Sequence, residues 1–589
     1  MIYRIYSNLS KFKNMEFHPG LNILLADKSP GSTDRQTRNR AGKSSLLEIV
    51  HFLSGTYMDP DSPFRKDALI NATFGMDWDV GGNRITVERT GNKPNKIFVV
   101  SGNTQQWPFP VTVDRAGEKP SITNTQWRNV LGDLIFKLDQ DVQIQSWGPK
   151  FRSLFSYFVR SENAGGFRSP VRQSVKQQKG DEQVALTFLV GLDWTIPQQF
   201  QQTREKERTL RELRKAADKG AFNQFIGTPA HLRTMLAVTE DKVKRLAVQL
   251  ASFRVLPQYE EYESEASQIT RQIAALNDEN TMDRELLAHL EEAVSREAAP
   301  TIPDVERIFN EAGVVLPNTV LRRFEDVRIF HESIVQNRKS YLDAEIEAAK
   351  TRIHRREQEK EKLDNRRAEL MSLLRSHGAL EHFTNLQAEQ TRLQAEFERT
   401  RAQYETAAYL ESQKTELEAE RNRLYQRLRQ DSTEQEIAVK NAILSFERVS
   451  SKLYEQEQAG RLTLTETQDG PVFDVAIQGA TSVGINKMQI FCFDMMLMQL
   501  CSDRKIGPKF LVHDSHLFDS VDERQIAKAL QEGAKLATEY SFQYIVTMNS
   551  DHLPPPRLFS NDFKLDKYIL QVRLTDNTVD GGLFGFRFD

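Results

Sequence analysis

The residues with the clearest chemical potential lie in one short stretch, Asn39-Arg40-Ala41-Gly42-Lys43-Ser44-Ser45. An apolar run, 21–25, precedes it and a mostly apolar segment, 46–50, follows it, which predicts a strand, a loop and a helix. In that context the backbone N–H groups bind a triphosphate, the lysine reaches its β- and γ-oxygens, and the serine hydroxyl ligates Mg²⁺. We therefore expect this stretch to bind a nucleotide, with Ser44 as a Mg²⁺ ligand.

The stretch departs from the consensus phosphate-binding loop G-x-x-x-x-G-K-[ST] in two places. Thr37 stands where the consensus has its first glycine, and Arg40 stands where many ATPases have a small residue. Residues 26–41 are therefore expected to form an enlarged loop that carries three arginines near the phosphates: Arg35, Arg38 and Arg40. The alternative is a chance Gly-Lys-Ser in a basic turn, which the strand-to-helix context disfavours.

A second candidate feature is an apolar strand, 509–513, that ends in Asp514. A carboxylate in this position is expected to complete a Mg²⁺ site beside a phosphate-binding loop. A helix, 522–540, and a further apolar strand, 542–547, follow it and predict a βαβ unit in a parallel sheet. Segments far apart in the sequence would thus meet in one nucleotide-binding head, with Asp514 as its second Mg²⁺ ligand.

Composition limits the class of protein. A chain of 589 residues exceeds one compact domain, and 27% charged against 39% hydrophobic residues indicates that much of it is elongated and solvated. The net charge of -3 gives no bulk attraction to nucleic acid or to a membrane. Two cysteines, Cys492 and Cys501, exclude a disulfide framework. With neither a signal peptide nor a membrane span in the sequence, we expect a cytoplasmic protein without a membrane partner.

Residues 198–456 have the composition of long helices. No proline occurs between Pro317 and Pro471, and Gly378 is the only glycine between Pro317 and Gly460, which predicts one very long helical limb. Apolar residues recur at intervals of seven and four positions, as at the core positions of a coiled-coil heptad repeat. They are Leu363, Leu370, Leu386, Leu393, Phe397, Tyr404, Leu417, Leu424 and Leu428. The pattern predicts an antiparallel coiled coil with its apex near 300–320; a folded helical bundle is the alternative.

Between 126 and 191 basic residues alternate with aromatic ones. Such a pattern is typical of a nucleic-acid surface and equally of a packed amphipathic face with solvated charges, and we favour the packed face. The residues concerned are Trp147, Lys150, Phe151, Arg152, Phe155, Tyr157, Phe158, Arg160, Arg168, Arg172, Lys176 and Lys179.

The order of these features resembles an ATPase of the SMC type, the group within the ABC ATPases that includes RecN and RecF. The resemblance covers nearly the whole chain and implies an α/β fold: an ABC-type head of mixed β-sheet and helices, assembled from an N-terminal lobe, 1–197, and a C-terminal lobe, 457–589, joined by the antiparallel arm 198–456. It also implies that Ser482 and Gly484 form a signature loop that touches ATP bound by the opposite subunit, so that two heads make a homodimer.

Three stretches resemble more closely a bacterial SMC-like family of ABC-three-component operons, thought to defend against phages and plasmids: 39–45, Ile490-Phe491-Cys492-Phe493-Asp494 and Val512-His513-Asp514-Ser515-His516. Our leading hypothesis is an ATP-dependent clamp or sensor that detects DNA and acts with a separate, nuclease-like effector and accessory proteins. Two alternatives stay open. One is a structural scaffold that is locked by ATP and hydrolyses it weakly, and the other is a repair ATPase like RecN or RecF.

The sequence departs from the family at the catalytic position. ABC ATPases usually carry glutamate after the acid of this strand, where it polarises the attacking water, but this chain has Ser515. A serine hydroxyl positions water and does not take its proton near neutral pH, so hydrolysis is expected to be slow. Asp514, Ser515 and His516 are the predicted catalytic residues, and the nearest candidates for a substitute base are His516, Asp519 and Glu523.

Other family positions differ as well. Asp519 to Asp522 resembles the D-loop, and Asn549 rather than Met548 is the candidate at the place of the family's switch histidine. The glutamine of the Q-loop has no clear counterpart; the cluster Gln173, Gln177 and Gln178 is one option. Since no cysteine precedes Cys492, a zinc hook in the helical arm is excluded.

Overall fold

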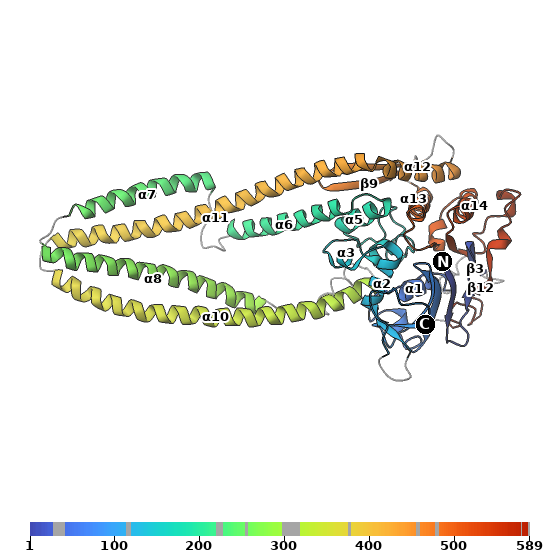
Figure 1. Cartoon of the computed structure of the whole chain (residues 1–589), viewed down its shortest axis with the longest axis horizontal. Coiled ribbons are helices and arrows are strands. Elements are labelled where there is room, and N and C mark those ends of the chain that lie inside the picture. Colours follow the sequence, from blue (N-terminus) through green and yellow to red (C-terminus); the bar gives the residue numbers. More distant parts are fainter. Residues whose placement is uncertain are drawn as a thin grey trace. The chain divides into compact units, whose positions relative to one another are not determined.

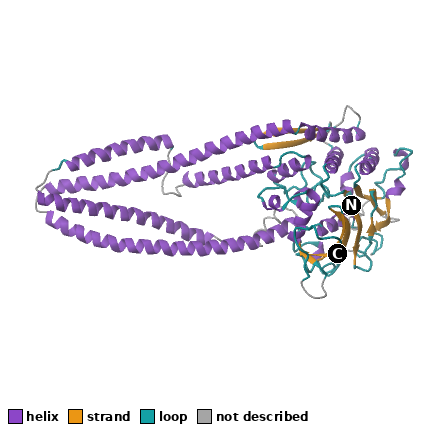
Figure 2. Ribbon diagram, viewed as in Figure 1, coloured by secondary structure: helices purple, strands orange, loops and turns teal. Residues whose placement is uncertain are grey.

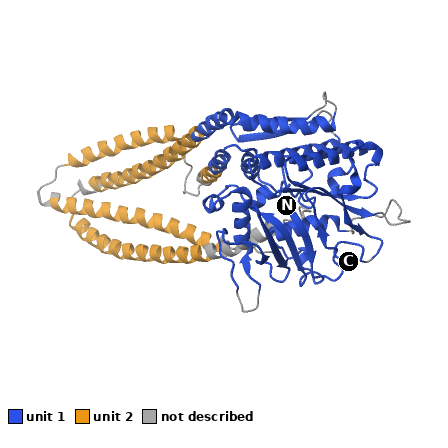
Figure 3. Cartoon of the chain, turned by 45° about the vertical axis from the view of Figure 1, so that its right-hand side comes forward, with its two compact units in different colours: residues 1–204, 308–325, 420–589 blue, residues 205–307, 326–419 orange. Residues whose placement is uncertain are grey.

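The computed structural model describes residues 1–27, 42–113, 119–218, 228–253, 257–296, 318–374, 379–454, 460–477, 482–578 and 580–586. Over these residues the chain combines β-sheets with long helices (Figures 1 and 2), which confirms the predicted α/β class. It divides into two compact units (Figure 3): unit 1 consists of residues 1–204, 308–325 and 420–589, and unit 2 of residues 205–307 and 326–419.

A parallel sheet forms the centre of unit 1. Its strand order is β10-β11-β3-β12, so β3 from the start of the chain lies between two strands from its end. Both faces of this sheet are covered, and β3 is accordingly apolar and buried along nearly its whole length. The strands are β3 (Gly20–Asp27), β10 (Phe510–His513), β11 (Gln543–Asn549) and β12 (Ile569–Thr575). The two lobes thus build one head, as predicted.

An antiparallel sheet completes the N-terminal part of unit 1, in the order β2-β1-β4-β5-β6-β7. Gln543 ties it to the parallel sheet, because its buried amide accepts from the Ile2 N–H and donates to the Ile2 carbonyl, both at 2.9 Å. The strands are β1 (Ile2–Ser7), β2 (Met15–Glu16), β4 (Thr73–Val80), β5 (Asn83–Thr90), β6 (Lys96–Ser101) and β7 (Ser121–Thr123). A separate hairpin joins β8 (Arg461–Thr467) to β9 (Gly470–Ala476).

Helices pack around these sheets in one continuous hydrophobic core. α13, which runs from Val483 to Asp503, is buried on nearly every side, and this explains why its sequence is apolar all round. The other helices of the head are α1 (Lys43–Leu53), α2 (Asn124–Phe136), α3 (Gln140–Ile144), α4 (Phe151–Phe155), α5 (Lys179–Val190), α12 (Glu436–Leu453) and α14 (Glu523–Glu539).

The basic and aromatic segment between 126 and 191 belongs largely to this core. Phe151, Phe155, Tyr157 and Phe158 are buried and therefore cannot stack on nucleic-acid bases. Arg160 is buried as well. The packed interpretation of this segment is the one that the structure supports.

Unit 2 is helical. Asp283 of α8 (Pro257–Arg296) contacts Arg352 of α10 (Asn318–Leu374), and Glu265, earlier in α8, contacts Arg366, later in α10. Because the pairing runs in opposite directions along the two helices, they are antiparallel, as the heptad pattern predicted. Ala266, Ile269, Ile273 and Leu370 form a buried cluster between them, with Leu363 packed against it.

The limb after Pro317 is not one helix. α10 ends at Leu374, α11 runs from Ala379 to Glu434, and α12 follows it. The rings of Phe253 and Phe383 lie 6.0 Å apart, so the end of α7 (Pro229–Ala251) is level with the start of α11. α8 also contacts α11 through Ser267 and Gln387, which gives the arm features of the alternative folded bundle. The remaining long helix is α6 (Thr195–Asp218).

The predicted apex, 300–320, lies almost entirely outside the described residues. In the part of the chain that the structure describes, no helix combines the length and the apolar composition that crossing a membrane requires.

We predict that Asp283→Asn destabilises the helical arm. Hydrogen bonds from Arg352 and Arg356 lower the pKa of Asp283 to about 2. A carboxyl group whose pKa falls on folding stabilises the fold above its unfolded pKa, and this contribution is lost as the pH falls toward the folded value. Asp283→Asn should therefore lower the melting temperature, followed by circular dichroism at 222 nm, at pH 7, and the difference from wild type should shrink as the pH falls below 4.

The matched control is Glu405→Gln, because Glu405 forms an exposed ion pair with Arg401 within one helix, α11. An equal drop of the melting temperature in both variants would show that the Asp283 cluster has no special role.

Candidate nucleotide site

The predicted phosphate-binding stretch is described in part. Asn39, Arg40 and Ala41 lie outside the described residues. Gly42 precedes α1 with φ 84° and ψ 21°, the left-handed conformation that favours glycine. A Cβ at this position would also lie 3.0 Å from the Leu583 Cβ. Gly42 therefore permits the turn that starts α1 at Lys43.

Ser44 and Asp514 are brought together by the fold. The Ser44 hydroxyl donates to Asp514 Oδ2 at 2.7 Å. The other carboxylate oxygen, Oδ1, accepts from the Ser515 N–H at 2.7 Å and from the Thr547 hydroxyl at 2.8 Å. These bonds fix the carboxylate plane and direct Oδ2 toward α1. A hydroxyl and a carboxylate are hard oxygen donors of the kind that Mg²⁺ prefers, so the pair fits the predicted metal role.

Lys43 is buried and donates to the side chain of Asn549. Asn549 lies at the end of β11, in register with Ala26 at the end of β3. Met548 is buried in the core instead. Of the two residues considered for the switch position, Asn549 is thus the one beside the lysine of the phosphate-binding stretch.

Ser515 and His516 form hydrogen bonds within the chain, and these bonds affect the roles that the two side chains could have in catalysis. The Ser515 hydroxyl lies 3.3 Å from Asp514 Oδ1 and donates toward it. His516 Nδ1 lies 2.9 Å from Asp519 Oδ2, and this hydrogen bond raises the pKa of His516. A histidine with a raised pKa is protonated over a wider pH range, and an imidazolium donates hydrogen bonds but cannot accept a proton. Glu523, the third candidate, is exposed at the start of α14.

Two residues near the site were not singled out from the sequence. Glu48 lies on α1, four residues after Ser44, and its Oε1 accepts from Asn163 Nδ2 at 3.1 Å. Burial and then the charge of Asp514 raise the pKa of Glu48 to about 7. An acid within an otherwise apolar helix segment is the only sequence signal that could have identified Glu48.

The predicted signature residues lie at the start of α13. Ser482 is the N-cap residue of this helix and is exposed, as is Val483. A Cβ on Gly484 would approach the Ser520 carbonyl oxygen to 2.3 Å, so glycine is required there by a backbone contact within the same chain. Ser520 belongs to the predicted D-loop. Gly484 therefore packs beside the predicted D-loop, and the contact of Ser482 and Gly484 with ATP of a second subunit stays a prediction.

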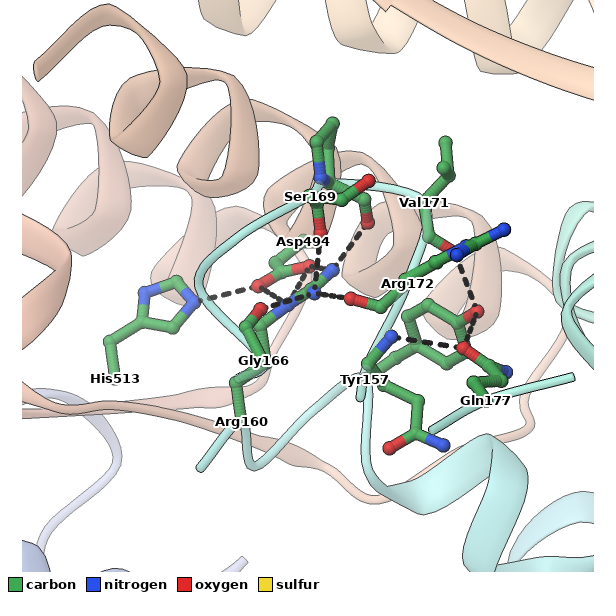
Figure 4. A network of polar contacts seen from close by, with 11 residues as sticks. Tyr157, Arg160, Gly166, Ser169, Val171, Arg172, Gln177, Asp494 and His513 are labelled. Carbon is green, nitrogen blue, oxygen red and sulfur yellow. Dashed lines mark hydrogen bonds and ion pairs between the residues drawn. The ribbon is translucent and has the colours of Figure 1, made fainter. Parts of the chain in front are cut away.

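A buried ion pair connects the two lobes beside this site (Figure 4). The Arg160 guanidinium bonds both carboxylate oxygens of Asp494 on α13, with distances of 2.7 to 3.0 Å, and neither side chain is exposed. Its remaining donors reach four backbone carbonyls that follow it in the chain: Gly166, Ser169, Pro170 and Arg172. Arg160 thus shapes the segment 160–172, which contains Asn163, and attaches it to α13.

His513 extends the network to the strand that ends in Asp514. Its Nε2 lies 3.1 Å from Asp494 Oδ2 and its Nδ1 lies 3.1 Å from the Tyr544 hydroxyl. Burial lowers the pKa of His513, so the ring is neutral, with Nε2–H donating to Asp494 and Nδ1 accepting from the tyrosine. The helix that begins with the signature residues is therefore hydrogen-bonded to the strand that positions Asp514.

The glutamine cluster of the sequence lies elsewhere in this region. Gln177 accepts from the Tyr157 hydroxyl at 3.3 Å and from the Gln173 N–H at 3.0 Å, and donates to Asp181 at 2.9 Å. Its side chain closes the loop rather than reaching α1. In the segment 160–172, the Asn163 amide does reach α1, where it bonds Glu48.

We predict that Asp494→Asn destabilises the head strongly, because it leaves the Arg160 guanidinium buried without its counter-charge. Breaking such a pair costs about 3 to 5 kcal/mol of unfolding free energy, measurable by urea denaturation of the full chain. Asp77→Asn is the control, since Asp77 makes the same kind of contact with Arg84, whose side chain is 62% exposed. Its loss of unfolding free energy should be far smaller. Similar small losses in both variants would contradict the assigned role of the pair.

Comparison with known proteins gives two domain matches. Residues 449–588 match a family described as an uncharacterised protein conserved in bacteria (DUF2326). Residues 284–411 match C-terminal domain 10 of the ABC-three component (ABC-3C) systems. No curated protein matches the chain.

Two solved structures align along most of the chain. One is an Smc head domain with a coiled coil and joint derived from Pyrococcus yayanosii, 13% identical, with 93% of this chain and 92% of that chain covered and a TM-score of 0.32. The other is an Smc head domain with an extended coiled coil, bound to the C-terminal domain of ScpA, derived from Pyrococcus furiosus; it is 10% identical, with 94% and 90% covered and a TM-score of 0.33. Taken together with the head geometry, the domain match at 284–411 supports the resemblance to an SMC-like ABC ATPase linked to ABC-three-component systems.

Proposed function

We propose that the chain is an ATP-dependent clamp that senses DNA in bacterial defence. The observation that carries this proposal is the meeting of Lys43 and Ser44 on α1 with Asn549 and Asp514 at the ends of two parallel strands. Each ATP would be held by the stretch 39–45 of one copy and by Ser482 and Gly484 of the other. Nucleotide state would then set the geometry of a homodimer.

Each residue of the site would have a separate role in ATP hydrolysis. Ser44 and Asp514 would hold Mg²⁺, which neutralises phosphate charge when bound. Ser515 fixes the Asp514 carboxylate through its backbone N–H. His516, paired with Asp519, would donate a hydrogen bond to phosphate oxygens as charge develops on them.

The domain match at 284–411 supports the link to defence systems and to partner proteins. In this proposal 1–197 and 457–589 form the ATPase head and 198–456 is the arm that transmits nucleotide state. An aberrant or linear DNA end is the detected object, and a separate nuclease-like effector acts on it. The setting is the bacterial cytoplasm.

A specific observation also favours the second candidate function, a scaffold that ATP locks. The Ser515 hydroxyl is bound to Asp514, and the raised pKa of His516 widens the pH range in which its imidazole is protonated and cannot accept a proton. If no other group accepts the proton of water, ATP would be bound and barely turned over.

We predict that the purified chain hydrolyses ATP slowly, that linear double-stranded DNA increases the rate, and that Lys43→Ala and Asp514→Ala each abolish it. The lysine and the acid are expected to bind the phosphates and Mg²⁺, respectively. Steady-state phosphate release measures the rates, and Lys66→Ala, at an exposed position of the head, is the control. Tight ATP binding without turnover would instead support the scaffold, and a chain that binds no ATP would overturn both.

A further inference from the structure

Hydrolysis of ATP at the candidate site would require a group that accepts the proton of water, and the predicted catalytic residues do not supply one. The Ser515 hydroxyl donates toward Asp514, and the imidazole of His516 is paired with Asp519. Asp514 itself is engaged by Ser44 through one oxygen and by Thr547 through the other. A further carboxylate close to these groups is therefore of chemical interest, and Glu48 is such a carboxylate.

The position of Glu48 on α1 places it beside the metal-ligand pair. Residues four apart on a helix share a face, so Glu48 lies on the face of Ser44. Helical side chains lean toward the helix N-terminus, so the Glu48 side chain covers the turn that carries Ser44. Burial and then the charge of Asp514 raise the pKa of Glu48, as a nearby carboxylate does. Glu48 thus lies on the side of α1 that carries Ser44, whose hydroxyl bonds Asp514.

A second segment holds Glu48 in place. The Asn163 amide donates to Glu48 Oε1 at 3.1 Å. Asn163 belongs to the segment 160–172, whose course is set by the bonds of the buried Arg160 to its carbonyls and to Asp494. A hydrogen bond to one carboxylate oxygen restricts the direction of the other oxygen.

We propose that Glu48 is the catalytic base of this head and that Asn163 is its positioning residue. The inference rests on the proposed function, that the head binds ATP. The oxygen of water would bond to the γ-phosphorus while the bond from that phosphorus to the β–γ bridging oxygen breaks. ADP leaves with that electron pair, and the proton of water passes to Glu48 Oε2. Glu48 on α1 would thus act as the base in place of the glutamate that ABC ATPases usually carry at the position of Ser515.

The test compares Glu48→Gln with wild type in three measurements: affinity for Mg²⁺-ATP by fluorescent-nucleotide titration, single-turnover hydrolysis, and ATP-dependent dimerisation by analytical ultracentrifugation. We expect ATP affinity within about threefold of wild type and turnover lower by about 100-fold or more, because general-base catalysis contributes about 10²- to 10⁴-fold. We also expect an ATP-bound dimer that persists where the wild-type dimer decays. Glu539→Gln, on the exposed end of α14, should behave as wild type.

Positioning by Asn163 has its own readout. Asn163→Ala should lower turnover about tenfold while ATP binding and the melting temperature stay unchanged. Asn163→Gln, which keeps the amide, should restore part of the rate. If both variants lose activity equally, Asn163 is not positioning Glu48 through its amide.

The outcomes separate the two proposals. If wild type hydrolyses ATP and Glu48→Gln hydrolyses it equally fast, the base assignment is wrong and the proposed function stands. The base assignment is also wrong if Glu48→Gln no longer binds ATP, or if wild type binds ATP without turning it over. A wild-type chain that binds no ATP overturns the proposed function itself.

Discussion

The placement of β3 between β11 and β12 is the constraint on which the head depends. Because β3 precedes the predicted phosphate-binding stretch, while Asp514 follows β10 and Asn549 ends β11, the candidate site exists only when both ends of the chain share one sheet. The bonds from Ser44 to Asp514 and from Lys43 to Asn549 follow from that arrangement. Folding of the head and assembly of the nucleotide site are therefore one event.

The buried pair of Arg160 and Asp494 adds a second link between the lobes. It attaches the segment that carries Asn163 to the helix that begins at the predicted signature residues, and His513 connects the same carboxylate to the strand before Asp514. Three elements around the candidate site are thus fixed by one group of buried charges. Such a network gives a physical route by which contacts at Ser482 would affect the groups around Asp514.

Local patterns predicted much of this architecture. Glycine before lysine and serine, between a strand and a helix, indicated the start of α1; an acid after an apolar run indicated Asp514; and the heptad spacing indicated antiparallel helices. The contact between Glu48 and Asn163 was not predictable, because it joins segments far apart in the sequence. For the same reason the partner of Asp494 and the course of 160–172 required the structure. The long limb predicted after Pro317 contains three described helices, α10, α11 and α12, rather than one.

The measurement that tests the central claim most directly is calorimetric titration of ATP into the full-length chain, with Mg²⁺ and with EDTA, for wild type and for Asp514→Asn. If Ser44 and Asp514 form one metal-assisted nucleotide site, Mg²⁺ should tighten ATP binding to wild type by about tenfold or more, equivalent to about 1.4 kcal/mol. Asp514→Asn should lose most of that gain. ATP binding that is indifferent to Mg²⁺ and to this substitution would contradict the account.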